Sequence, residues 1–452
     1  MKRHLMTALD AWKNSKRRKP LILNGARQVG KTWLLKEFGT TRYDNVAYAN
    51  FDGSVALAAS FAADFDMRRI LTNLQAATGE KIVEGSTLLI LDEIQECPRA
   101  LTSLKYFQEQ APNIHVAAAG SLLGLTVHEG TGFPVGKVNM LDLHPLDFRE
   151  FLDATGNTML RELVDEGDPT SINAFGPKLT ELLKQYYFAG GMPEAVAAFI
   201  DDGALESARN VQEEILRSYR LDASKHLSAR ETEHVLAVWD SLPAHLSREN
   251  KKFVFGQIHD GARARDYRSA ITWLVQAGLA TRVDRVSKPG VPLSSYASDN
   301  AFKLFCLDIG LLGALSGLNQ QAIAEGNAAF TEFKGALTEQ YVCQQLVASC
   351  GLEPFYWSAN NSRGEIDFLA QKAGKTYAIE VKAEENLRAK SLRAFKERYP
   401  DVQALRFSLS GYQQQDWMAN VPLYAMFSEK LWGSSAPLNV PCSPAGNTGV
   451  RS

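Results

Sequence analysis

A glycine-rich segment near the start of the chain carries the clearest chemistry in the sequence. It reads Gly25-Ala-Arg-Gln-Val-Gly-Lys-Thr and matches the pattern GxxxxGK[ST] in full. Glycines let backbone N–H groups approach phosphate oxygens, the lysine reaches the β- and γ-phosphates, and the threonine hydroxyl is a ligand for Mg²⁺. An apolar run at 21–24 precedes the segment and a helical pattern at 32–38 follows it, as this motif requires. We therefore expect ATP and Mg²⁺ at Gly25, Ala26, Arg27, Gln28, Val29, Gly30, Lys31, Thr32 and Trp33.

Two acidic residues after a second apolar run complete the expected nucleotide site. Leu88-Leu-Ile-Leu is followed directly by Asp92 and Glu93. Asp92 is expected to hold the Mg²⁺ together with Thr32, and Glu93 to polarise the attacking water as the general base. Ser121 follows the next apolar run and is a candidate contact of the γ-phosphate, with an ordinary helix N-cap as the alternative.

No arginine stands out as a finger that would stabilise the charge on the transferred phosphate. Arg99 and Arg149 are candidates, and a surface role is the alternative for each. A finger supplied by a second copy of the chain would require a homo-oligomer.

A second group of chemically capable residues lies near the C-terminus. Asp367 stands in Gly364-Glu-Ile-Asp-Phe-Leu-Ala, and Glu380 and Lys382 stand in Tyr377-Ala-Ile-Glu-Val-Lys-Ala. Both segments alternate as half-buried strands do, so two adjacent strands would bring the three residues together.

Carboxylates grouped with a lysine are typical of metal-dependent phosphodiesterases, in which the metal lowers the pKa of bound water. We expect Asp367, Glu380 and Lys382 to be catalytic, and Glu339, Asp367 and Glu380 to bind Mg²⁺. The alternative is a salt-bridged pair of strands on an exposed sheet face.

The elements that must position these residues follow from the pattern of apolar runs. Residues 20–145 alternate strands and helices, which predicts an α/β domain with a mostly parallel sheet. Residues 146–230 are nearly all helical, and 331–430 read as helix, strand, strand, helix, strand. A basic helix is expected at 1–19, and the Ser/Pro/Gly/Asn-rich end at 433–452 is expected to be disordered.

Residues 231–320 follow the winged-helix order of helix, turn, helix and two-stranded wing. A helix is expected at 263–276 and a strand at 279–286, before a Pro/Gly turn. Basic residues that suit phosphate contacts gather here, namely Lys251, Lys252, Arg263, Arg265 and Arg268. DNA binding is one interpretation, and a protein-binding module or a cover over the nucleotide is the other.

Composition excludes several classes of protein. The chain has 452 residues, of which 45% are hydrophobic and 22% charged, and its formal net charge is −2. These values exclude a low-complexity chain or a polycation, so a nucleic-acid site must be a local patch. No apolar run is long enough to span a membrane, and five cysteines without a CxxC pair argue against structural zinc or a disulfide framework. A cytoplasmic location is expected.

An ordered set of motifs resembles one family. GARQVGKTWLLKEF, LLILDEIQECP, PLDFREF, YYFAGGMPEAV and the series GALTEQYV, GEIDFLA and AIEVKA are similar to bacterial and archaeal AAA-type ATP-binding proteins with a C-terminal domain of unknown function. The resemblance covers about residues 1–430. It implies an AAA+-like P-loop core, a helical lid at 146–230, a winged-helix segment and a C-terminal domain similar to PD-(D/E)xK nucleases. It also implies the nucleotide and nuclease-type roles given above.

Three functions are compatible with these expectations, the third being a nucleotide-dependent assembly protein with no nucleic-acid role. The first is an ATPase that binds DNA and uses its nucleotide state to control a Mg²⁺-dependent nuclease-like domain. The alternative is a nucleotide-switched regulatory protein whose nuclease-like domain binds DNA or a protein partner without cutting.

Overall fold

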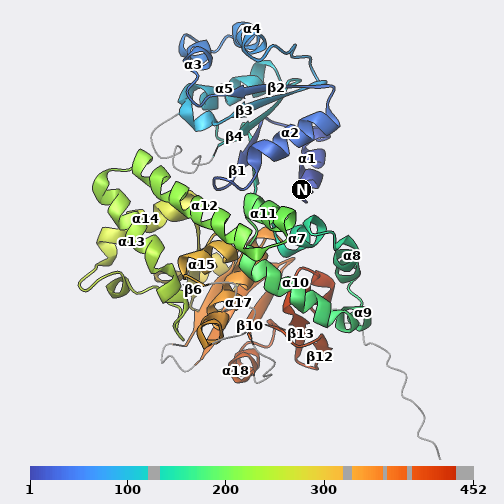
Figure 1. Ribbon diagram of the computed structural model, residues 1–452, viewed down its shortest axis with the longest axis vertical. Helices are drawn as coiled ribbons and strands as arrows, with labels where there is room; N and C mark the ends of the chain where they lie inside the picture. Colours follow the sequence, from blue (N-terminus) through green and yellow to red (C-terminus); the bar gives the residue numbers. More distant parts are fainter. Residues whose placement is uncertain (121–132, 319–327, 360–363, 384–388, 434–452) are drawn as a thin grey trace, which may run out of the picture.

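The computed structural model describes residues 1–120, 133–318, 328–359, 364–383 and 389–433. Ser121 and residues 434–452, and with them the γ-phosphate contact and most of the tail expected from the sequence, lie outside the described residues. An upper α/β body holds the first sheet, and a lower body combines many helices with a second sheet (Figure 1).

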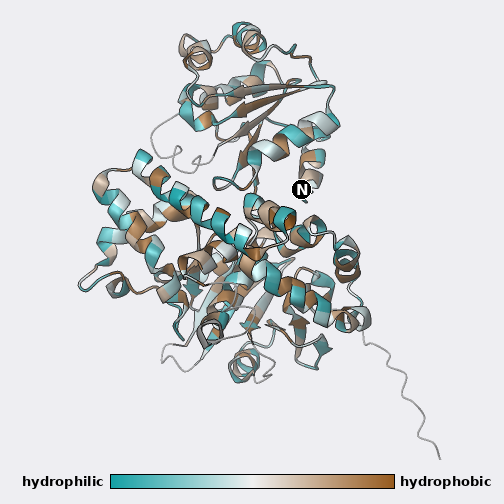
Figure 2. Cartoon of the chain, viewed as in Figure 1, coloured by the Kyte–Doolittle hydropathy of each residue, from teal (hydrophilic) through white to brown (hydrophobic). Residues whose placement is uncertain are grey.

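The upper body is built on a five-stranded parallel sheet of order β2-β3-β4-β1-β5. Its strands are β1 (Leu21–Asn24), β2 (Asn45–Asn50), β3 (Thr87–Asp92), β4 (His115–Ala119) and β5 (Asn139–Asp142). Alternate residues of β3 face opposite sides, so that Leu88 and Ile90 join one core and Leu89 and Leu91 join another. The sequence of a strand that is buried on both faces is a continuous apolar run. Figure 2 shows the hydrophobic strands of this sheet.

Helices cover both faces of this sheet. They are α1 (Met6–Lys13), α2 (Lys31–Arg42), α3 (Val55–Ala62), α4 (Met67–Thr78) and α5 (Pro98–Gln110). Leu9 of α1 and Leu34 of α2 pack on one face, while Ile70 of α4 and Leu104 of α5 pack on the other. The parallel α/β core predicted for 20–145 is confirmed.

The middle of the chain is helical, as predicted. Its helices are α7 (Phe148–Ala154), α8 (Thr158–Glu166), α9 (Pro169–Ala174), α10 (Gly176–Ala189), α11 (Pro193–Asp202), α12 (Leu205–His226), α13 (Ala229–Leu246) and α14 (Ala264–Gln276). The long α12 runs beneath the upper body (Figure 1). A capping box at Ser228 and Glu231 starts α13, because each side chain bonds the backbone N–H of the other residue.

The lower body contains an eight-stranded mixed sheet of order β12-β13-β11-β10-β9-β8-β6-β7. Its strands are β6 (Ala280–Val286), β7 (Ala297–Cys306), β8 (Phe355–Ser358), β9 (Glu365–Lys372), β10 (Lys375–Val381), β11 (Gln403–Ser408), β12 (Gln413–Gln414) and β13 (Met418–Pro422). Helices α15 (Ile309–Leu315), α17 (Ala328–Ala348) and α18 (Lys390–Arg398) pack around it.

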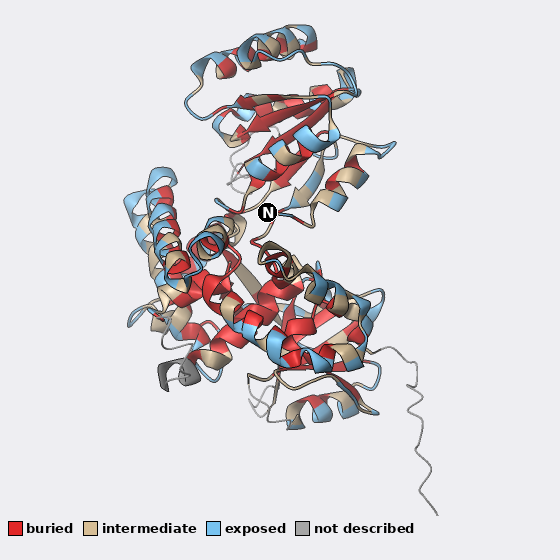
Figure 3. Cartoon of the chain, turned by 45° about the vertical axis from the view of Figure 1, so that its right-hand side comes forward, coloured by how far each residue is buried: buried red, intermediate tan, exposed pale blue. Residues whose placement is uncertain are grey.

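The predicted wing is part of this larger sheet. Strand β6 pairs antiparallel with β7 on one side and parallel with β8 on the other. Val286 of β6 is buried with Phe355 and Trp357 of β8, so apolar burial favours closing the free edge of the hairpin. The segments 231–320 and 331–430, predicted as two domains, therefore share one sheet. Figure 3 shows buried residues throughout both bodies.

Among the described residues, no helix is both long enough and apolar enough to cross a bilayer.

Candidate functional site

The loop between β1 and α2 has the backbone that its glycines predict. Gly25 has φ +147°, and a Cβ there would lie 2.3 Å from the Leu143 carbonyl oxygen, so no other residue fits. Gly30 has φ +93° and is the N-cap of α2. The N-terminus of α2 therefore presents its N–H groups toward the loop, which favours a bound anion.

Lys31 and Thr32 begin α2, and their side chains turn toward the loop and β3. The Lys31 Nζ donates to the carbonyl oxygens of Gly25 at 2.8 Å and Ala26 at 2.7 Å. Burial lowers the pKa of Lys31 to about 8, although Glu93 and Asp92 act in the opposite direction.

The Mg²⁺-binding pair predicted for the nucleotide site comes together. The Thr32 hydroxyl donates to Asp92 Oδ2 at 2.8 Å, and the hydroxyl of Tyr48 on β2 donates to the same oxygen at 2.8 Å. A hydroxyl and a carboxylate oxygen at the end of a parallel strand are suitable ligands for Mg²⁺ beside a phosphate. The residues present therefore fit the ion. The sequence gives no indication that Tyr48 belongs to the site, because the pairing of β2 with β3 places it there.

Glu93 follows Asp92 in a left-handed backbone conformation, with φ +50°. This conformation costs about 1 kcal/mol for a non-glycine residue, and strained residues of this kind are concentrated at functional sites. The side-chain amide of Gln95 donates to Glu93 Oε2 at 2.5 Å. Gln95 therefore fixes the carboxylate predicted to be the general base, a contact that the sequence did not predict.

The helical segment contacts the phosphate loop directly. Arg27 forms an ion pair with Asp222 of α12, with Nη1 2.9 Å from Oδ1, and the Tyr219 hydroxyl donates to the Arg27 carbonyl oxygen at 2.8 Å. On another side, a Cβ at Gly278, just past α14, would lie 3.3 Å from the Ala26 backbone nitrogen. The loop is thus held between α12 and the end of α14.

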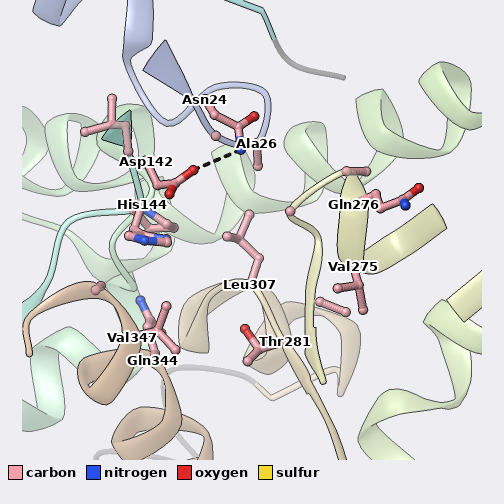
Figure 4. Close-up of a pocket in the computed structure, with 17 residues that line it drawn as sticks. Asn24, Ala26, Asp142, His144, Val275, Gln276, Thr281, Leu307, Gln344 and Val347 are labelled. Atoms are coloured by element: carbon pink, nitrogen blue, oxygen red, sulfur yellow. Dashed lines mark hydrogen bonds between the residues drawn. The ribbon is translucent and has the colours of Figure 1, made fainter. Parts of the chain in front are cut away.

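A cavity of about 220 Å³ lies behind the loop at this junction (Figure 4). Asn24 and Asp142 line its upper side, and the Asn24 side-chain amide donates to Asp142 Oδ1 at 2.9 Å. Gln276 and Thr281, from either side of the α14–β6 turn, and Gln344 of α17 line the rest. Four segments distant in sequence therefore meet beside the nucleotide site.

Trp33 is 44% exposed, which is unusual for so large an aromatic residue. It lines a second cavity of about 810 Å³ between α1, α2 and the start of the helical segment. Arg3 lies at this cavity and is buried, donating to the Val29 carbonyl oxygen at 2.8 Å and pairing with Glu150 at 3.1 Å. The N-terminus thus supports the loop through Arg3, a role that the basic composition of 1–19 did not predict.

Both arginines considered as fingers are held by near neighbours. The Arg99 Nε donates to the Phe61 carbonyl oxygen at 2.6 Å. Arg149 pairs with Asp165 at 3.2 Å and lies over the Phe427 ring. The homo-oligomer that would supply a finger in trans stays a prediction.

The predicted basic cluster is divided. Lys252, Arg263, Arg265 and Arg268 are exposed, and the last two lie on α14. Lys251 is instead buried, with its Nζ 2.7 Å from Glu339 Oε1. Lys251 is therefore held at the C-terminal carboxylates, where one carboxylate neutralises its charge, and is not part of the exposed patch.

The C-terminal carboxylates come together around lysines. Asp367 of β9 accepts a hydrogen bond from the Val381 N–H at 2.7 Å, and Glu380 pairs with Lys382 at 2.9 Å. Burial, together with the nearby Glu339, raises the pKa of Asp367 to about 7. Lys303 of β7, which sequence reasoning missed, contacts Glu339 Oε2 at 3.7 Å.

This arrangement does not fit a Mg²⁺ ion. Within the described ranges, no three His, Cys, Asp or Glu side chains form a group that could hold a metal. Glu339 Oε1 lies 2.7 Å from the Lys251 ammonium group, while Glu339 Oε2 lies 3.7 Å from that of Lys303 and accepts no hydrogen bond from the described residues. One buried oxygen of Glu380, Oε2, accepts no hydrogen bond from the described residues, while its other oxygen is on Lys382. The Mg²⁺ roles of Glu339, Asp367 and Glu380 therefore stay predictions that this geometry does not support.

Three family profiles match separate parts of the chain. A family described as an AAA domain matches residues 17–152, and two domains of unknown function, DUF8612 and DUF4143, match residues 180–322 and 334–426. No curated protein matches the chain.

Similar solved structures share little sequence identity with this chain. The Walker-type ATPase PABY2304 of Pyrococcus abyssi is 16% identical, with 69% of this chain and 94% of that chain covered and a TM-score of 0.42. The Orc1 protein of Aeropyrum pernix, solved in complex with DNA, is 14% identical, with coverages of 72% and 92% and a TM-score of 0.26. A RuvB variant of Thermotoga maritima is 16% identical, with coverages of 62% and 87% and a TM-score of 0.26.

The AAA-domain match and the geometry of the loop agree on the class of protein. Residues 17–152 carry a P-loop of the AAA type on a parallel α/β sheet. This part of the chain is P-loop ATPase-like, and ATP hydrolysis is the general reaction of P-loop ATPases.

Proposed function

We propose that this chain is an ATPase that binds duplex DNA, and that its nucleotide state changes how firmly the DNA is held. The observation that carries this proposal is the contact of the phosphate loop with both α12 and the end of α14. The C-terminal domain acts in it as a binding platform and does not cut. The proposal combines the ATPase and DNA binding of the first function expected from the sequence with the non-cutting C-terminal domain of the second.

Each residue of the nucleotide site has a role in the proposed reaction. Lys31 would bind the β- and γ-phosphates, after its ammonium group leaves the carbonyl oxygens of the loop. Thr32 and Asp92 would hold Mg²⁺, which neutralises charge on the phosphates. Glu93 would orient and deprotonate the attacking water. The exposed ring of Trp33 offers a surface on which the nucleotide base can stack.

Nucleotide binding is coupled to α12 and α14 because bound phosphates change the contacts that the loop makes with these helices. Phosphates bind to the backbone N–H groups of the loop, including that of Ala26, which lies against Gly278. The arriving charge also competes with Asp222 for the guanidinium of Arg27. Both changes alter the contacts of the loop with α12 and α14. The position of α14 therefore differs between the nucleotide-free and the nucleotide-bound state.

DNA binding is supported by the exposed arginines at the start of α14. Arg263, Arg265 and Arg268 are spaced so that they can contact neighbouring phosphates from one end of the helix. Helix α14 is also the second helix of the expected helix-turn-helix, the position that enters the major groove in such proteins.

The test measures duplex DNA binding by fluorescence anisotropy, with no nucleotide, with ADP and with a non-hydrolysable ATP analogue. We expect wild-type affinity to differ between nucleotide states. We also expect the slope of the logarithm of the binding constant against the logarithm of salt concentration to fall in magnitude by about one in each of Arg263→Gln and Arg268→Gln.

Two further variants make the test specific. Arg68→Gln, an exposed arginine on α4 of the upper body, should leave binding unchanged. Asp222→Asn should retain DNA binding but weaken its dependence on nucleotide. Equal affinity for DNA in all nucleotide states would refute the proposal. So would DNA binding that is unchanged in both Arg263→Gln and Arg268→Gln.

A further inference from the structure

Two lysines are directed into a group of one buried and two half-buried carboxylates where the C-terminal sheet meets the segment predicted to be a winged helix. Lys303 comes from β7, and Lys251 comes from the connection between α13 and α14. The carboxylates are Glu339 of α17 and Glu365 and Asp367 of β9. The five residues thus come from four separate segments of the chain.

Lys303 is almost inaccessible to solvent, with 1% of its side chain exposed. Its Nζ lies 2.5 Å from Glu365 Oε1 and 3.7 Å from Glu339 Oε2. A buried ammonium group is strongly unfavourable unless carboxylates surround it, so these contacts hold Lys303 in its charged form. Its Nζ also lies over the Tyr356 ring, 5.0 Å from the ring centre.

Lys251 supplies the second positive charge from a different direction. Its Nζ lies 2.7 Å from Glu339 Oε1, and both side chains are 10% exposed. Glu339 therefore has one ammonium group at hydrogen-bond distance from Oε1 and a second, that of Lys303, 3.7 Å from Oε2. Two ammonium groups carry the same charge as one divalent cation, and they reach the carboxylate expected to bind Mg²⁺.

We propose that Lys251 and Lys303 take the place of a divalent cation among these carboxylates and fasten the winged-helix segment to the C-terminal domain. An ammonium group cannot act as a Lewis acid or lower the pKa of a bound water to generate a nucleophile. The site is thus structural, and the chain does not hydrolyse phosphodiesters there. This inference rests on the proposed function, in which the C-terminal domain does not cut, and gives the structural reason for the absence of cutting.

The experiment measures Mn²⁺ binding to the nucleotide-free full chain by electron paramagnetic resonance. We compare wild type, Lys251→Met/Lys303→Met, and the same double variant carrying Glu339→Gln. The wild type is expected to show no Mn²⁺ site that depends on Glu339. Removing both lysines should raise Mn²⁺ affinity by about tenfold or more, because the carboxylates are left uncompensated. Adding Glu339→Gln should abolish that gain.

Two results would overturn the proposal. One is a wild-type Mn²⁺ site that is lost in Glu339→Gln, and the other is no gain when both lysines are removed. Lys375→Met, an exposed position at the start of β10, is the matched control and should change nothing. If the double variant does not fold, the same Mn²⁺ measurement on Lys251→Met tests the proposal. In this variant Lys303 stays in place, and Glu339 loses only one of its two cations.

ATP turnover measured on the same variants separates this inference from the proposed function. If ATP turnover is normal and the wild type has a Glu339-dependent Mn²⁺ site, only the proposal that the two lysines replace a divalent cation is refuted. Absent turnover with the expected Mn²⁺ results would refute the ATPase alone.

Discussion

Lys31 determines how the nucleotide site should respond to pH. Burial lowers its pKa to about 8 in the chain without nucleotide, against an ordinary value of 10.5. Bound phosphates favour the ammonium form and so raise this pKa. Nucleotide binding above about pH 8 must therefore be accompanied by proton uptake, and affinity must fall as pH rises through that value.

This prediction is checked by calorimetric titration with ATP in two buffers of different ionisation enthalpy. At about pH 9, where much of the free Lys31 has lost its proton, the difference between buffers should report uptake of a fraction of a proton or more. At about pH 6.5 the same comparison should give almost none. No buffer dependence at the higher pH would contradict the assigned role of Lys31.

The local part of the nucleotide site was predictable from sequence. Gly25, Lys31, Thr32, Asp92 and Glu93 are fixed by short patterns, because the turn, the helix start and the strand end are each local structures. Tyr48, Gln95 and Asp222 were missed for a physical reason. Their contacts with the site depend on side-chain conformation or on packing between elements far apart in sequence.

At the scale of elements, Asp308 joins helix α15 to the helical segment. It is fully buried, and its carboxylate accepts from the N–H groups of Gly310 at 2.9 Å, Leu311 at 3.1 Å and Gly191 at 2.7 Å. The side-chain amide of Gln344 donates to it at 3.0 Å. One side chain therefore caps α15 and fixes the glycine turn between α10 and α11.

Asp308→Ala should lower the free energy of unfolding by about 3 kcal/mol or more, because several buried donors lose their acceptor. Asp308→Asn retains one acceptor oxygen and should cost less. Urea denaturation followed by tryptophan fluorescence measures both. Asp284→Ala, a half-buried aspartate on β6, is the control. An Asp308→Ala chain as stable as that control would contradict the proposed role.

The fold could be predicted element by element more readily than as an assembly. The expected strand at 21–24 has those bounds in the structure, and the helix expected at 263–276 is α14 (Ala264–Gln276). The alternation of apolar residues is sufficient for such assignments. It could not show that β6 pairs with β8, because the partner of a sheet edge is chosen by burial between distant segments.

At the scale of the whole molecule, the nucleotide loop lies at the junction of the two bodies. Helix α12 and the end of α14 contact it from below, and the cavity behind it is lined by α17 as well. The C-terminal sheet takes in the hairpin that follows α14. In the proposed function, a displacement at the loop is transmitted through these packed elements to α14 and to the sheet beyond it.

The central claim is that this chain hydrolyses ATP at the P-loop with Glu93 as the general base. The most direct measurement is ATP turnover by wild type and Glu93→Gln, with nucleotide binding measured on both. We predict that turnover falls by about a hundredfold or more in Glu93→Gln while ATP and Mg²⁺ still bind. Glu96→Gln, an acidic neighbour in the same turn, is the matched control and should keep turnover. Unchanged turnover in Glu93→Gln, or none in the wild type with Mg²⁺, would contradict the claim.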